Sequence, residues 1–175
     1  MRRTGTTRRG AFTATGAIAM GAVLAGCGDG TGTREGPARA DAATAAEQAA
    51  AARAEKTLRE GAAGTSRELL ARYEQVVRAH PATAAGLSPL RDAVRAHAKA
   101  LAPDGGKTLV FSRTRATDAE AALKELAAAE RRTADAHTAT LLKAPPELAR
   151  LLASIAAAGA AHAYLLTELA KETSS

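Results

Sequence analysis

Two glutamates and two histidines interrupt helical stripes that are otherwise apolar: Glu74, His97, Glu130 and His162. Carboxylate and imidazole groups are ligands for zinc, manganese and iron. Counted from the predicted turns between helices, Glu74 lies at a depth similar to that of His97, and Glu130 at a depth similar to that of His162. These four residues are therefore the candidate ligands of a single divalent metal ion.

The same residues also have a structural interpretation. A lone histidine on a helical stripe is commonly a hydrogen-bonded interior residue, and Glu130 can pair with His162 or His97 across a bundle. Gly159 precedes His162 by one helical turn, and a residue this small lets a neighbouring helix approach closely, at a cost of about 1 kcal/mol in helix propensity. His137 is expected to face inward at the far end of its helix, without a second ligand nearby. At this level both interpretations stay open.

The elements that would position these side chains are four amphipathic helices, over about 41–80, 88–102, 117–143 and 145–172. Alanine makes up roughly a quarter of the chain, well above its usual share, and aromatic residues are 2%. No stretch alternates apolar and polar residues over strand length. The pattern predicts an all-α four-helix bundle with alanine-rich interfaces. Its expected core comprises Leu69, Leu70, Tyr73, Val76, Val77, Leu87, Leu90, Val94, Leu101, Leu123, Leu126, Leu141, Leu148, Leu151, Leu152, Ile155, Leu165, Leu166 and Leu169.

Local signals predict where the helices begin and end. Pro81 stops the first helix at His80, and Ser88 is the expected N-cap of the second, with Pro89 at its first helical position. Thr117 and Glu120 form the pattern of a capping box for the third helix. The first helix is expected to have a weak point near 61–64, where glycines occur.

The connection between the second and third helices, residues 102–116, is longer than the other two. At about 3.3 Å per residue it can run the length of the bundle. It therefore permits a crossover, with the second and third helices parallel and residues 108–111 covering apolar positions.

The segments "LLARYEQVVRAHP", "LRDAVRAHAKAL", "AAAERRTADAH" and "LLASIAAAGAAHAYLL" resemble the four helices of a ferritin-like domain found in exported lipoproteins of the actinobacterial type. The function of that family is not known. The resemblance implies a ferritin-like bundle in which Glu74 and Glu130 are the single carboxylates and His97 and His162 the histidines.

This chain departs from the di-iron pattern at two positions. A di-iron bundle places a glutamate three residues before each histidine, and Val94 and Gly159 stand there instead. Two divalent ions bring four positive charges, which two glutamates cannot offset in a low-dielectric interior. A ferroxidase-type di-iron centre is therefore not expected.

The first residues have the order of a lipoprotein signal peptide. A head with four arginines, Arg8 and Arg9 among them, precedes an apolar run over 11–25, which is shorter than the roughly 20 apolar residues of a membrane-spanning helix. Leu24-Ala25-Gly26-Cys27 then resembles a lipobox, whose cysteine carries diacylglycerol and palmitate. The alternative, a buried cysteine in an N-terminal helix, conflicts with the glycines that surround Cys27.

The leader predicts the domain organisation and the location. We expect a signal peptide over 1–26, a lipidated Cys27 with a flexible tether over 27–40, and a bundle over 41–175. The membrane lipid is then a partner through the acylated Cys27, on the extracytoplasmic face of the cell membrane. Arg8 and Arg9 fit a twin-arginine export signal, and the general secretory route remains the alternative.

The basic charge of the chain belongs mainly to the leader. Four of the 24 Lys and Arg residues lie in positions 1–26, which hold no acidic residue, so the rest of the chain has 20 basic against 18 acidic residues. With two Phe and two Tyr in the whole chain, there is no stacking platform for nucleic acid. A nucleic-acid partner is therefore not expected.

Signatures of enzymes are missing from the sequence. It has no glycine-rich phosphate loop before a helix and no Gly-x-Ser-x-Gly elbow, and its one cysteine is assigned to the anchor. The sequence therefore favours a non-catalytic binding or structural module without a cofactor. A metal-binding or redox bundle is the alternative, and the alanine-rich faces also suit a protein partner or a homo-oligomer.

Overall fold

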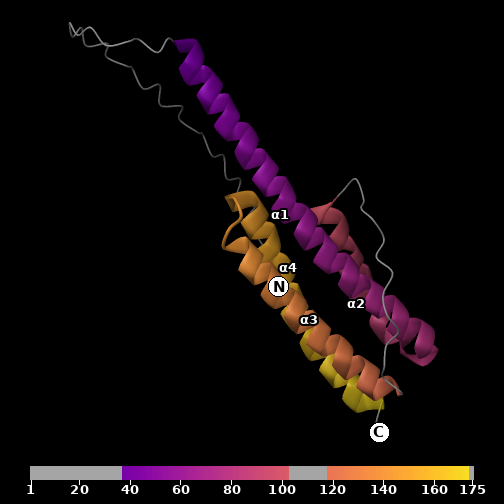
Figure 1. Cartoon of the computed structure of the whole chain (residues 1–175). Coiled ribbons are helices and arrows are strands. Elements are labelled where there is room, and N and C mark those ends of the chain that lie inside the picture. Colours follow the sequence, from indigo (N-terminus) through magenta and orange to yellow (C-terminus); the bar gives the residue numbers. More distant parts are fainter. Residues whose placement is uncertain (1–36, 103–117, 174–175) are drawn as a thin grey trace, which may run out of the picture. The chain divides into compact units, whose positions relative to one another are not determined.

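The computed structural model describes residues 37–102 and 118–173. It contains four α-helices, α1 (Pro37–Ala79), α2 (Ala84–Leu101), α3 (Ala119–Leu141) and α4 (Pro146–Thr173), with a short 3₁₀ helix, η1 (Pro81–Thr83), between the first two (Figure 1). No strand occurs in these described residues, and the predicted all-α class is confirmed. The predicted signal peptide, Cys27 and the 103–117 part of the long connection lie outside them.

Helix α1 is continuous over its 43 residues. It runs without interruption through Gly61 and Gly64, where a weak point is expected from the sequence. The Thr65 hydroxyl donates to the carbonyl of Gly61 at 3.3 Å, a bond within the helix. Proline suits the first helical position, so α1 begins at Pro37 and includes the last residues of the segment predicted as a tether.

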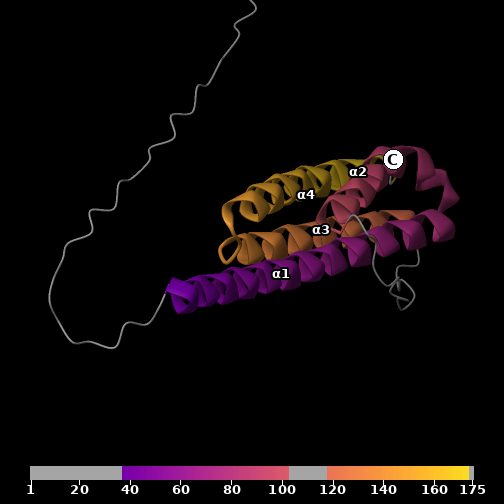
Figure 2. The ribbon, with the colours of Figure 1, turned by 90° about the horizontal axis from the view of Figure 1, so that it is seen from above.

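The first part of α1 lies outside the packed bundle. Every residue from Ala42 to Ala54 is exposed, and both views show this indigo end extending past the turn between α3 and α4 (Figures 1 and 2). Alanine has the highest intrinsic helix propensity, and Arg59 pairs with Glu55 one turn away at 2.6 Å. Local interactions therefore support this part of the helix.

Helix α2 begins at Ala84, which corrects the prediction of an N-cap at Ser88. The chain leaves α1 at His80 and turns through η1, where the Thr83 hydroxyl donates to the carbonyl of His80 at 2.8 Å. The helix follows directly from this turn, so Pro89 lies inside it. Proline removes one backbone donor there, and Pro89 is exposed on the outer face of the helix.

Helix α3 also begins differently from the prediction. Its N-cap is Asp118, whose carboxylate accepts a hydrogen bond from the backbone N–H of Ala121 at 2.7 Å. The predicted cap, Thr117, lies outside the described residues. The helix ends at Leu141, two residues before the end expected from the sequence.

The helix directions follow from the contacts between them. Tyr73 of α1 meets Glu130 of α3, and Ser66 meets His137, so these two helices run antiparallel. The η1 turn makes α2 antiparallel to α1 as well, and therefore parallel to α3. Helices α3 and α4 form an antiparallel hairpin with the most extensive contact in the bundle (Figure 2).

The core consists of two clusters of buried side chains. One joins all four helices around Leu69, Tyr73, Leu87, Leu123 and Leu166, and the other surrounds Leu101, Leu148 and Leu152. The predicted stripes supply most of both clusters.

Helix α4 departs from the predicted stripe at one residue. Leu165 is 49% exposed beside Tyr164 on the outer face, which corrects its assignment to the core. Among the described helices, α4 is long and apolar enough to span a membrane by length and composition alone, and part of its most apolar stretch is buried in the bundle.

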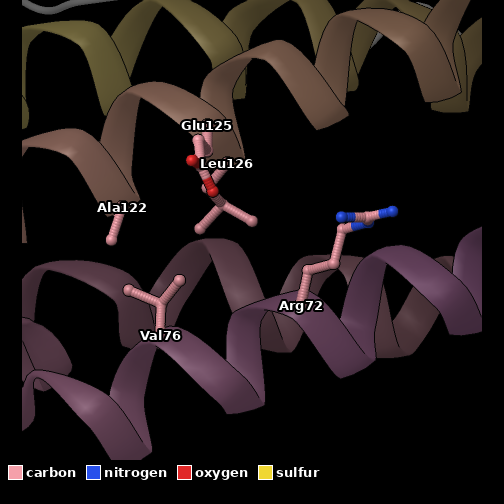
Figure 3. Close-up of a pocket in the computed structure, with 5 residues that line it drawn as sticks. All are labelled: Arg72, Val76, Ala122, Glu125 and Leu126. Carbon is pink, nitrogen blue, oxygen red and sulfur yellow. The ribbon is translucent and has the colours of Figure 1, made fainter. Parts of the chain in front are cut away.

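The seam between α1 and α3 leaves two hollows at the surface. The smaller, of about 20 Å³, is lined by Arg72 and Val76 from α1 and by Ala122, Glu125 and Leu126 from α3 (Figure 3). The larger, of about 140 Å³, lies next to it and shares Arg72. The contact between α1 and α3 is also less extensive than that between α3 and α4.

Candidate functional site

Glu130 is at the centre of a polar cluster inside the bundle. Its side chain is 1% exposed, and its Oε1 atom accepts a hydrogen bond from the Tyr73 hydroxyl at 2.6 Å. The Nδ1 atom of His162 lies 3.1 Å from the same oxygen. The carboxylate of α3 is therefore connected to α1 and α4 at once, and the predicted pairing of Glu130 with His162 is confirmed.

Tyr73 takes part in this cluster as a hydrogen-bond donor. Burial raises the pKa of its phenol far above the usual value, and the charge of Glu130 and the bond to it raise the pKa further. The hydroxyl therefore stays protonated and keeps donating to Glu130. The sequence pattern places Tyr73 among the apolar core residues and gives no sign of this role.

His97 of α2 extends the cluster toward the surface. Its ring is stacked on that of His162, with centroids 6.2 Å apart and planes 15° from parallel. Burial lowers the pKa of His97, and the neighbouring His162 lowers it further, while the charge of Glu130 acts in the opposite direction. His97 is therefore mainly neutral near pH 7, and the cluster joins all four helices.

His137 forms a second polar contact two turns further along α3. It is 1% exposed, and its Nε2 atom lies 3.1 Å from the Ser66 hydroxyl of α1. The inward position predicted for His137 is confirmed, but its partner Ser66 was not predicted. Ser66 precedes Tyr73 by seven residues, or two helical turns, and this spacing is the signal that places both on one face of α1.

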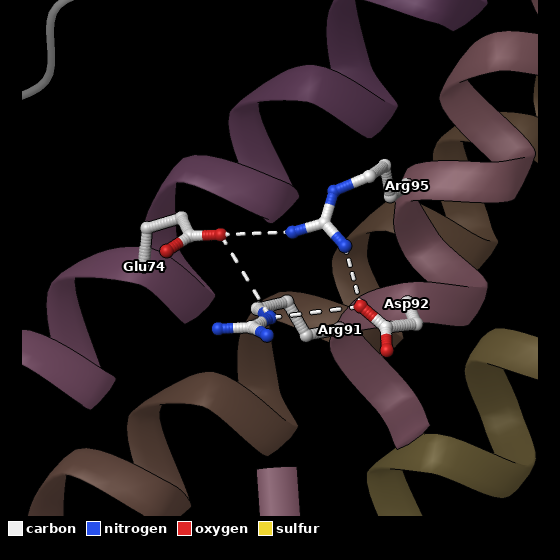
Figure 4. A network of polar contacts seen from close by, with 4 residues as sticks. All are labelled: Glu74, Arg91, Asp92 and Arg95. Carbon is white, nitrogen blue, oxygen red and sulfur yellow. Dashed lines mark hydrogen bonds and ion pairs between the residues drawn. The ribbon is translucent and has the colours of Figure 1, made fainter. Parts of the chain in front are cut away.

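Glu74 does not join the other three predicted ligands. It is partly exposed and lies 3.2 Å from a guanidinium nitrogen of Arg95 and 3.8 Å from that of Arg91, both on α2 (Figure 4). Successive helical residues are rotated by about 100°. Because Tyr73 points into the bundle, Glu74 is turned toward the α1–α2 surface. This corrects its placement on the interior stripe.

The arrangement has consequences for metal binding. The structure brings together Glu130, His162 and His97 but not Glu74. In the described ranges, 37–102 and 118–173, no group of three or more His, Cys, Asp and Glu side chains is placed to hold a metal ion. The Oε1 atom of Glu130 already accepts the Tyr73 hydrogen bond and faces His162. The cluster is thus arranged for hydrogen bonding between helices.

Gly159 explains how α4 approaches this cluster. A Cβ atom at this position would lie 3.3 Å from Oε2 of Glu130 and 3.4 Å from Cβ of Ala134. The first contact is tighter than ordinary van der Waals separation, and the second is at its lower limit. The prediction that a small residue here permits close approach of the helices is confirmed.

The buried histidines make the stability depend on pH. Burial lowers the pKa of His137, and His97 nearby lowers it further. The unfolded chain, with a histidine pKa of about 6.5, takes up protons before the folded one. The stability contributed by neutral His137 is therefore present above about pH 6.5 and lost as the pH falls toward its folded pKa.

We expect the free energy of unfolding, measured in urea, to decrease between pH 7.5 and pH 5.5. The decrease should be smaller in His137→Gln, whose amide keeps a polar contact with Ser66 but does not titrate. His97, whose pKa is also lowered by burial, accounts for the decrease that remains in this variant. An unchanged pH dependence in the variant would contradict this assignment.

Comparison with protein-family models, curated proteins and solved structures finds no match to this chain.

Proposed function

We propose that this chain is an exported lipoprotein whose helical bundle has a non-catalytic binding or structural role on the extracytoplasmic face of the membrane. The anchor is diacylglycerol on Cys27, after removal of residues 1–26. The bundle is of the ferritin-like type, with the carboxylate and imidazole groups of its interior used to join helices.

The location is supported by the order of features in the leader. An arginine-rich head, a short apolar run and Leu24-Ala25-Gly26-Cys27 follow one another without interruption. Each buried methylene of an acyl chain contributes about 0.8 kcal/mol, so two or three chains hold a protein firmly on a membrane. Lipidation also gives the one cysteine of the chain a role.

The non-catalytic role is supported by the burial of the polar cluster. A general acid or base must reach the proton that it transfers, but Glu130 and Tyr73 are 1% and 0% exposed and are bonded to each other. His162 and His137 are also buried, each against a polar partner. These groups are paired inside the bundle and are not open to a substrate.

Replacement of Cys27 with serine tests the anchor. We expect the unmodified chain to sediment with membranes and to carry a mass increase for acyl chains on a polypeptide that begins at residue 27. The Cys27→Ser variant should lack the acyl mass and leave the membrane fraction, because a hydroxyl is not the lipid acceptor. Intact-mass spectrometry and membrane fractionation measure both outcomes.

Two further observations complete this test. A variant with Arg8→Lys and Arg9→Lys distinguishes the export routes, since loss of export indicates the twin-arginine route and normal export the general one. A chain that keeps residues 1–26 and an unmodified Cys27 would contradict the anchor. A melting temperature raised by Zn²⁺, Mn²⁺ or Fe²⁺, with no rise in His162→Ala, would contradict the structural role of the cluster.

A further inference from the structure

The larger hollow on the α1–α3 seam combines an apolar floor with charged walls. Leu69 and Ala129 are buried at its base. The polar residues that line it are Thr65, Glu68 and Arg72 from α1, and Arg132 and Thr133 from α3.

On each of the two helices, periodicity places the polar side chains on the face that lines the hollow. Arg72 follows Glu68 by one turn on α1, and Arg132 and Thr133 follow the floor residue Ala129 by one turn on α3. Since α1 and α3 are neighbours, the two arginines reach one cavity from opposite walls. The neighbouring hollow shows the side chain of Arg72 extending from α1 into the gap between the helices (Figure 3).

The two arginines have no internal partner. Within the described parts of the chain, neither Arg72 nor Arg132 forms an ion pair or a hydrogen bond with another residue, and neither does Thr133. Glu68 shares the cavity without pairing with Arg72. Two guanidinium groups against one carboxylate leave a positive excess, together with a hydroxyl that is available to donate.

This combination matches the chemistry of a tetrahedral oxyanion. Guanidinium groups bind phosphate oxygens through pairs of parallel N–H···O bonds. A volume of about 140 Å³ is several times what one water molecule needs, so a phosphate group and some of its water fit. Arg131, the residue before Arg132 on α3, is also exposed but does not line the hollow. It donates instead to the Thr167 hydroxyl of α4 at 3.3 Å.

We propose that the cavity between Arg72 and Arg132 is a binding site for a phosphate group. The group belongs either to a free phosphate or to the headgroup of an anionic phospholipid, and both present the same oxygens to the two guanidinium groups. The site lies on the bundle itself and does not depend on lipidation of Cys27.

The first arm of the test uses inorganic phosphate and the purified full chain carrying Cys27→Ser, followed by isothermal titration calorimetry. We expect binding by this chain, and a weakening of about tenfold or more when Arg132→Gln is added, because a charge-assisted contact is lost. Adding Glu68→Gln should strengthen binding, since it removes the negative charge from the cavity. Circular dichroism confirms that each variant folds.

Arg131→Gln is the matched control. It removes the same charge from the neighbouring position of the same helix, outside the cavity. Phosphate affinity should change little in this variant. Equal weakening by Arg131→Gln and Arg132→Gln would overturn the proposal, because it would show that phosphate responds to net charge alone.

The second arm uses flotation with phosphatidylglycerol vesicles and the same set of variants. Vesicle binding that decreases in Arg132→Gln and not in Arg131→Gln identifies a lipid headgroup as the source of the phosphate. Binding of inorganic phosphate without vesicle binding identifies a free phosphate. The absence of binding in both arms would overturn the proposal while leaving the anchor unaffected.

Discussion

Replacement of Glu130 with alanine is expected to lower the free energy of unfolding by about 3 kcal/mol or more, because each buried polar group left without a partner costs about 1–3 kcal/mol. The change removes the acceptor for the Tyr73 hydroxyl and the partner of His162, which are 2.6 and 3.1 Å from the carboxylate. Both groups would then stay buried without a partner. Urea or guanidinium unfolding of the full chain measures the difference.

Two variants separate this effect from the loss of any glutamate. Glu130→Gln keeps an oxygen that can accept from Tyr73, so it should cost less than Glu130→Ala. Glu125 is exposed on the same helix, and Glu125→Ala should change the stability by no more than about 0.5 kcal/mol. If Glu130→Ala lowered the free energy of unfolding no more than Glu125→Ala, the polar cluster would not stabilise the packing of the helices as its geometry indicates.

Replacement of Gly159 with leucine is expected to destabilise the protein by about 3 kcal/mol, at the upper end of the usual range for overpacking. Even a Cβ atom at this position would lie 3.3 Å from Oε2 of Glu130 and 3.4 Å from Cβ of Ala134. A leucine must therefore displace the carboxylate or separate α3 from α4. Either movement weakens the contact of Glu130 with His162 as well as the packing.

Gly61 provides the matched control for this prediction. It lies in a helix, as Gly159 does, but a Cβ atom there would meet nothing within 4 Å. Gly61→Leu should therefore stabilise the protein by up to about 1 kcal/mol, because leucine has the higher helix propensity. Thermal unfolding of both variants, followed by circular dichroism, gives the comparison. Destabilisation of equal size at the two positions would show that the close approach of α3 and α4 is not the cause.

Much of the fold was predictable because its signals are local. The period of 3.6 residues places Leu87, Leu90 and Val94 on one face of α2, and all three are buried. The predicted helix ends were less accurate, since the place where a helix begins depends on the conformation of the residues before it. Ser88 and Pro89 suit a helix start, but η1 begins the helical path earlier and carries both of them into α2.

The candidate site was predictable only in part. Glu130 and His162 were expected to meet, because their distances from the α3–α4 turn match, and they do. Glu74 was placed on the interior stripe and its neighbour Tyr73 among the apolar residues, whereas the structure puts the phenol against Glu130 and turns Glu74 toward Arg95. A difference of one residue is a rotation of about 100° around the helix, and a broad stripe does not resolve which of two neighbours points to the centre.

By itself, the sequence determined the helical class and the residues of the apolar stripes, because these follow from contacts within a turn or two of one helix. The tertiary structure alone decided which polar side chains meet: Tyr73 with Glu130, Ser66 with His137, and Arg72 facing the same cavity as Arg132. Such pairs depend on the register and rotation of one helix against another. Register and rotation are set by the packing of all the side chains of both helices together, and no single stretch of sequence contains that information.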